Sequence, residues 1–177
     1  MALVALVACA HTRPAGHAGP APVTRAAVDE AEDALRRRAH DEARAAYERA
    51  VATAPDRVSE VYARKELASA LLLWDERAAA AAQLARVTAL APEDAAAWHD
   101  LGIVRHALGD VEGARAALRE ARRLRPHDAR PRLALAALAW ASGDRAAALA
   151  EYRGLEALDL PPRVREKVRW AIAELQK

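Results

Sequence analysis

The residues of this 177-residue chain that come nearest to a chemical site are His99, Asp100 and His106. Imidazoles and carboxylates can hold zinc, but histidines seven positions apart on a helix are separated by roughly 10 Å of axial rise, too far for one ion. The sequence has no Gly-rich phosphate loop, no H-E-x-x-H motif and no nucleophile elbow. We therefore expect no catalytic residue, metal, cofactor or small-molecule substrate, and interpret both histidines as partly exposed side chains on a helix face.

Cys9 is the single cysteine, so an intramolecular disulfide is impossible. It follows the apolar run Met1–Ala8, and Leu6–Cys9 resembles a bacterial lipobox, in which small residues precede a cysteine that receives lipid. The resemblance implies a signal peptide, lipidation at Cys9 and a place in the bacterial cell envelope. Ala10, in place of an aspartate, favours the periplasmic face of the outer membrane. The missing Lys or Arg before the run favours the alternative, an apolar terminus with an incidental thiol.

Ala10–Val23 is predicted to be a flexible linker. Its Pro and Gly residues break helices, and it has no apolar periodicity. His11 and His17 lie in it, and we interpret them as solvated side chains.

Composition indicates an all-α chain without a nucleic-acid partner. Alanine and arginine dominate, both are strong helix formers, phenylalanine is absent, and no segment alternates in the manner of a strand. The densest basic runs, 36–38 and 122–125, are the pattern that a nucleic-acid interface would use. However, both lie near predicted helix ends with acids nearby, where a cation is favourable to the helix dipole, and the formal net charge is only +2.

Asp94–Pro126 has the pattern of two short amphipathic helices joined by a Gly-Asp turn. Gly102 and Ala114 carry almost no side chain, so the two helices can approach closely there. Trp98 and Leu118 would then fill the seam around that contact. One such hairpin cannot bury its whole apolar face alone, so it needs copies stacked against it.

Those copies are visible as columns of equivalent residues that recur along the chain. The step is 34 residues throughout, except for a step of 37 between the first two hairpins. The columns are Ala43, Ala80, Ala114 and Ala148; Tyr47, Leu84, Leu118 and Tyr152; Leu67, Leu101 and Leu135; and Ala68, Gly102 and Ala136. Several columns kept in step predict a helical repeat protein, not an irregular helical bundle.

The spacing within Asp94–Pro126 resembles the tetratricopeptide repeat (TPR), whose signature has a tryptophan, a leucine-glycine pair, later alanines and a closing proline. The matching residues are Trp98, Leu101, Gly102, Ala114, Leu118, Ala121 and Pro126. Arg105 replaces the usual tyrosine, and Leu118 the usual aromatic. The resemblance implies an all-α, right-handed superhelical solenoid of antiparallel helix hairpins.

The predicted organisation has seven segments. They are a signal-like apolar segment (1–9), the linker (10–23), four hairpins (24–57, 58–94, 95–128 and 129–162) and a final helix (163–177). The longer step predicts a longer first helix, or a longer preceding loop, in the second hairpin. In the final segment Val164, Val168, Ile172 and Leu175 form one apolar stripe. We interpret this segment as a capping helix with a polar outer face, and a partner-binding helix is the alternative.

In TPR folds the first helices of successive hairpins line a concave face. The resemblance therefore assigns a partner-binding groove to Tyr62, Lys65, Ser69, His99, Ile103, His106, Arg130, Leu133 and Trp140. This set is slightly basic and favours an acidic or carboxylate-bearing partner, and Trp140 has the alternative of packing against the capping helix. The Lys/Asn clamp with which one TPR subgroup holds a C-terminal carboxylate is missing. The matching positions are Val28, Glu32, Glu66, Ala96 and Asp100.

Together these features predict a non-catalytic protein-interaction scaffold that receives a peptide or helix of another protein. With the lipobox, we expect an envelope-anchored TPR lipoprotein that aids assembly of a multiprotein complex and meets the membrane only through a lipid on Cys9. The alternative is a cytoplasmic TPR adaptor or regulator without an anchor.

Overall fold

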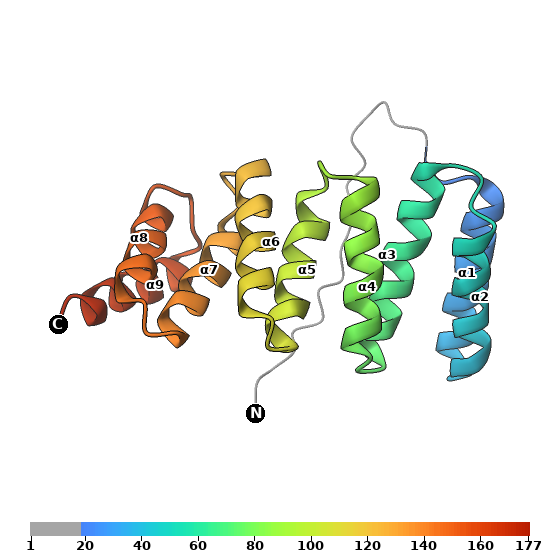
Figure 1. Ribbon diagram of the computed structural model, residues 1–177, viewed down its shortest axis with the longest axis horizontal. Coiled ribbons are helices and arrows are strands. Elements are labelled where there is room, and N and C mark those ends of the chain that lie inside the picture. Colours follow the sequence, from blue (N-terminus) through green and yellow to red (C-terminus); the bar gives the residue numbers. More distant parts are fainter. Residues whose placement is uncertain (1–18) are drawn as a thin grey trace.

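The computed structural model describes residues 19–177, which form four antiparallel helix hairpins and one final helix. The helices are α1 (Pro22–Arg36) and α2 (His40–Ala52), α3 (Arg57–Leu73) and α4 (Arg77–Leu90), α5 (Ala95–Ala107) and α6 (Val111–Leu124), α7 (Ala129–Ala141) and α8 (Arg145–Glu156), and α9 (Pro162–Leu175). The hairpins lie side by side along the long axis, with α1 and α2 at one end and α9 at the other (Figure 1). The predicted all-α helical-repeat solenoid is confirmed.

The start of the solenoid differs from the prediction in detail. Lipidation of Cys9, and most of the predicted linker, lie outside the described residues. Helix α1 begins at Pro22, two residues before the predicted start, and proline suits a first turn because its missing N–H needs no partner there. The longer second hairpin is explained by α3, which has 17 residues where α5 and α7 have 13.

Every hairpin turns through one residue with a left-handed backbone. These residues are Arg38, Asp75, Gly109 and Gly143, with φ of 60°, 61°, 83° and 76°. Their amides and the amides that follow them bond back to the last turn of the preceding helix, as in the 2.9 Å bond from the Asp110 amide to the Arg105 carbonyl. This is the Schellman arrangement that ends a helix. The turn residues follow the same 37- and 34-residue steps as the core columns.

Aspartate is the N-terminal capping residue of five helices in the described part of the chain. The aspartate carboxylates accept backbone N–H groups that have no partner inside the helix, which satisfies the exposed first turn. The capping residues are Asp56, Asp94, Asp110, Asp128 and Asp144, ahead of α3, α5, α6, α7 and α8. In the third and fourth hairpins the capping aspartate directly follows the turn glycine, so α6 and α8 start immediately after the turn.

Small residues set how closely the helices of a hairpin approach. All four alanines of the first column (Ala43, Ala80, Ala114 and Ala148) are completely buried. At Gly102 a Cβ atom would lie 2.6 Å from Leu118 Cγ and 3.2 Å from the Ala114 carbonyl oxygen, so only glycine fits without a shift. Trp98 is only partly buried: it packs beside Leu84 and Leu101, and its Nε1 donates a 2.9 Å hydrogen bond to the Pro92 carbonyl.

Candidate partner-binding surface

The first helices of the hairpins form one side of the solenoid. Helix α1 contacts α3, and α5 contacts α7, in addition to the contacts that each makes with the intervening second helix. We call the surface of α1, α3, α5 and α7 the first-helix face. It carries all the predicted groove residues. Ser69, Ile103, His106 and Arg130 are exposed there, and Tyr62, Lys65, His99, Leu133 and Trp140 are partly buried.

The two basic side chains predicted for this face are both neutralised by helix-capping aspartates. Lys65 Nζ lies 2.7 Å from Asp94 Oδ2, and Arg130 Nη2 lies 2.6 Å from Asp128 Oδ2. Burial alone would raise the pKa of Asp94, but the hydrogen bond and charge of Lys65, with two backbone amides, outweigh it and lower that pKa. The hydrogen bond from Arg130 likewise lowers the pKa of Asp128. Lys65 and Arg130 therefore add little net positive charge to the face, and the slight basic character predicted for the groove does not come from them.

At the α1 end two tyrosines, Tyr47 and Tyr62, lie among charged side chains of both signs. The Arg25 guanidinium lies over the Tyr62 ring, 5.9 Å from its centroid. Burial raises the pKa of Tyr62, and the negative charge of Glu66 raises it further. Burial also raises the pKa of neighbouring Tyr47 to about 12, with Glu32 and Glu66 adding to the effect. Both phenols stay neutral, and Glu32 Oε2 lies 3.9 Å from Arg36 Nη1, so the charges at this end are mixed.

The histidines in the middle of the face do not form a metal site. His99 Nδ1 lies 3.1 Å from Asp100 Oδ1, whereas His106, two turns further along α5, is exposed. Within residues 19–177, no three His, Cys, Asp or Glu side chains are grouped so that they could hold a metal ion.

At the opposite end, residues of α7, α8 and α9 line an open apolar hollow of about 660 Å³, which we call the C-terminal pocket. The Trp140 indole stacks on Trp170, with ring centroids 6.0 Å apart and planes 9° apart, and meets the Tyr152 ring edge-on at 6.0 Å. The pocket is lined by Leu133, Trp140, Tyr152, Val164, Lys167, Val168, Trp170 and Ala171. Two of these residues, Leu133 and Trp140, belong to the predicted groove.

Trp140 thus takes the alternative place considered for it, against the final helix, and Trp170 covers it. Trp170 is 63% exposed, and it was not among the predicted site residues. A signal was present in the sequence. Trp170 lies outside the apolar stripe of Val164, Val168, Ile172 and Leu175, on the side of a capping helix that should be polar. A large exposed aromatic at such a place needs an explanation other than core packing.

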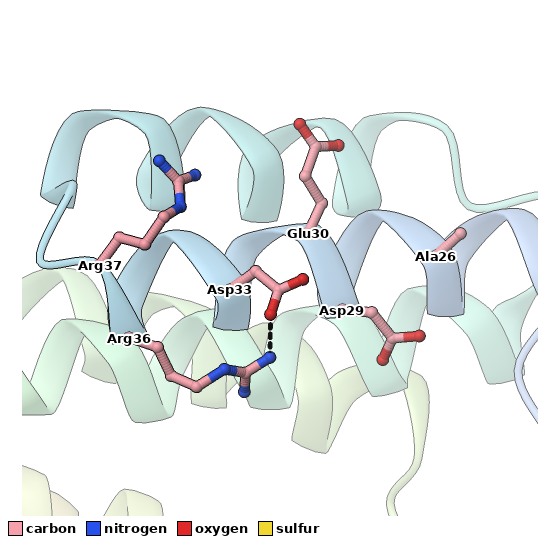
Figure 2. A pocket seen from close by; sticks show the side chains of 6 residues that line it. All are labelled: Ala26, Asp29, Glu30, Asp33, Arg36 and Arg37. Atoms are coloured by element: carbon pink, nitrogen blue, oxygen red, sulfur yellow. Dashed lines mark hydrogen bonds and ion pairs between the residues drawn. The ribbon is translucent and has the colours of Figure 1, made fainter.

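The α1 end of the solenoid has a polar, charged outer surface in place of an apolar pocket. Figure 2 shows the outer side of α1, a shallow hollow lined by Ala26, Asp29, Glu30, Asp33, Arg36 and Arg37. Its charges pair locally, as in Arg36 with Asp33 and Arg37 with Glu42. This surface is suited to closing the end of a solenoid in water. Each helix within residues 19–177 is too short or too polar to span a bilayer.

Comparison with known proteins agrees with this architecture. The family model described as tetratricopeptide repeat matches residues 95–128, which include α5 and α6. No curated protein matches the chain in sequence.

Solved structures resemble the chain in fold. A tetratricopeptide repeat protein from Parabacteroides merdae aligns with a TM-score of 0.75 at 11% identity, over 88% of this chain and 61% of that one. MamA aligns at 0.65 with 22% identity, over 74% of this chain and 75% of that chain. The first TPR of Spaghetti (RPAP3), bound to the HSP90 peptide SRMEEVD, aligns at 0.60 with 19% identity, over 72% and 99%.

Proposed function

Because the chain is a tetratricopeptide-repeat protein, we propose that it is a non-catalytic scaffold that binds a segment of another protein along the first-helix face. The observation that carries the proposal is the C-terminal pocket, where Trp170 stacks on Trp140 with one face and remains 63% exposed to solvent. Aromatic side chains that are rigid and partly exposed are the type that most often dominates binding energy at interfaces. An apolar hollow of this size suits one or two side chains of a partner.

The TPR of Spaghetti (RPAP3) was solved with an HSP90 peptide, so a related fold receives a protein segment. The present chain does not offer the same peptide an equivalent clamp. Glu32, Glu66 and Asp100 stand at positions where that TPR subgroup has Lys or Asn, and their carboxylates cannot donate the hydrogen bonds that hold a C-terminal carboxylate there. We therefore place the main contact at the C-terminal pocket, next to α7 of the first-helix face, and not at the α1 end.

Partner capture from the source cell tests this proposal. Tagged full-length chain and its Trp170→Ala variant are cross-linked, purified and compared by mass spectrometry. Leu108→Ala is the matched control, because Leu108 is also an exposed apolar side chain, 46% exposed, but lies at the end of α5 away from the pocket. We expect one set of partners to be lost with Trp170→Ala and kept with Leu108→Ala. Equal capture by all three proteins would rule the pocket out as the contact.

We further propose that the scaffold is held at the periplasmic face of the bacterial outer membrane by a lipid on Cys9, and that it helps to assemble a multiprotein complex there. The apolar run before Cys9 and the lipobox-like Leu6–Cys9 support this part. In cells fed labelled palmitate, the wild-type chain should become labelled and the Cys9→Ser variant should not. If neither is labelled, the anchor is excluded and the cytoplasmic adaptor becomes the better description.

A further inference from the structure

We propose that the C-terminal pocket receives a bulky apolar side chain from an acidic segment of the partner protein. This inference rests on the proposed scaffold function and names the chemistry of the segment. It is carried by two observations: the shape of the pocket and the unpaired positive charge around it.

The pocket is formed by three helices, which gives it walls as well as a floor. Trp140 and Tyr152 meet edge-on at 6.0 Å, Trp170 stands over Trp140, and Leu133 from α7 and Val164 from α9 complete the apolar lining. Its one charged lining residue is Lys167. An aromatic or large aliphatic side chain can therefore be desolvated on several sides at once, which is the environment of a binding hot spot.

Positive charge on α9 borders this pocket. Arg163, Lys167 and Trp170 are spaced at i, i+4 and i+7, so they share one helix face, and they line a second open hollow with Glu166. Arg165 pairs with Asp159. Arg163 and Lys167, in contrast, have no carboxylate partner among the described residues. A carboxylate of the partner beside the apolar side chain would supply the missing counter-charge.

The basic residues of the first-helix face differ from those of α9, and the difference supports binding of an acidic segment beside α9. Lys65 and Arg130 are already neutralised by Asp94 and Asp128. An acidic segment therefore finds cations without a carboxylate partner on α9, and not at Lys65 or Arg130. Complementarity of this kind sets which partner binds, and in which direction, more than it sets raw affinity.

A membrane surface is the competing ligand for a helix with cations and an exposed tryptophan. Anionic bilayers attract Arg163, Lys167 and Trp170 as an exposed stripe. They do not account for a walled hollow that reaches inward to Leu133 on another helix. The pocket geometry therefore favours a protein segment.

Selection of random twelve-residue peptides displayed on phage, with the full-length chain as bait, tests the inference. We expect enriched peptides to carry a Trp, Phe or Leu flanked by Asp or Glu. Their resynthesised forms should bind roughly tenfold more weakly to Trp170→Ala and to Arg163→Glu with Lys167→Glu, and added salt should weaken binding. Arg119→Glu, an exposed charge reversal on α6, is the control and should leave binding unchanged.

Three results would overturn the inference. They are no enrichment, enriched peptides without acidic residues, and binding that survives the charge reversal on α9. Binding of the chain to anionic phosphatidylglycerol vesicles that depends on both Trp170 and Lys167 would assign the pocket to the membrane instead. Partner capture in cells that needs Trp170 but tolerates the α9 charge reversal would leave the scaffold function intact and remove only the acidic segment.

Discussion

Lys65 on α3 donates a hydrogen bond to Asp94, the residue that caps α5, with Nζ 2.7 Å from Oδ2. The other oxygen of the same carboxylate accepts the amides of Ala96 and Ala97 at 3.0 Å and 3.1 Å. One aspartate therefore starts the third hairpin and ties it to the second. The charge of Lys65 is neutralised by this contact. Lys65 therefore helps to hold the second and third hairpins together and does not make a groove basic.

Replacing Asp94 should measurably weaken the solenoid. We expect Asp94→Ala to lower the free energy of unfolding by about 1–2 kcal/mol, because it removes a helix cap and leaves Lys65 without its partner. Asp94→Asn should cost less, since asparagine also caps helices and only the charge is lost. Urea unfolding followed by circular dichroism measures both. If Lys65→Met and Asp94→Asn had strictly additive effects, the two side chains would not be coupled.

The same pair should make stability depend on acid pH. The folded-state pKa of Asp94 lies below its ordinary value of 3.8, so its stabilising contribution is fully present above that value and is lost as the pH falls through the folded pKa. The difference in urea midpoint between wild type and Asp94→Asn should therefore be constant from pH 7 to pH 5 and shrink below about pH 4. An unchanged difference at pH 3 would mean that Asp94 does not carry this charge-dependent contribution.

Gly102→Ala should destabilise the protein although alanine is the better helix former. The new methyl group would lie 2.6 Å from Leu118 Cγ, and Leu118 is completely buried and cannot swing away. Overpacking of this kind costs about 1–3 kcal/mol. Gly154→Ala is the matched control, because its methyl would meet the flexible end of Arg132, and its loss should be smaller. A gain in stability for Gly102→Ala would contradict the close helix approach.

The repeat architecture could be predicted because equivalent core residues recur at a constant spacing along the sequence. Ala80, Ala114 and Ala148 each occupy the same completely buried site, so the 34-residue step in the sequence is also a step in the core. The degree of burial of Trp98 was harder to predict from the sequence. It depends on the hydrogen bond by which Trp98 Nε1 reaches the Pro92 carbonyl in the preceding loop, which no periodicity encodes.

The candidate site was harder to predict for a related reason. Lys65 and Asp94 are 29 positions apart, and their pairing depends on the loop between hairpins. The exposure of Trp170 depends on how α9 sits against α7 and α8, which determines that Trp140 and not Trp170 is the covered ring. The sequence predicted which residues lie along the first helices, but not which side chains they would contact.

Arg38→Gly should stabilise the protein. Arg38 holds a left-handed backbone with φ of 60° at the turn where the third and fourth hairpins have glycine, and its side chain is exposed. An L-residue in that conformation costs about 1–2 kcal/mol, part of which glycine returns as extra entropy of the unfolded chain, so we expect a net gain of up to about 1 kcal/mol. The reverse change, Gly143→Ala at φ of 76°, should lose about 1 kcal/mol. Thermal unfolding measures both, and changes of the same sign would contradict the turn assignment.

Trp140 and Trp170 should separate stability from binding. Trp140 contacts both Trp170 and Tyr152 and packs beside buried Ala139 and Leu175, so Trp140→Ala should lower the free energy of unfolding by about 2–3 kcal/mol, somewhat less than a fully buried aromatic. Trp170 is 63% exposed, so Trp170→Ala should cost less than about 1 kcal/mol. Urea unfolding measures the costs, and intrinsic fluorescence of Trp170→Ala should shift to shorter wavelength as the most exposed indole is removed. Equal costs for the two variants would mean that Trp170 is part of the core and is not available to a partner.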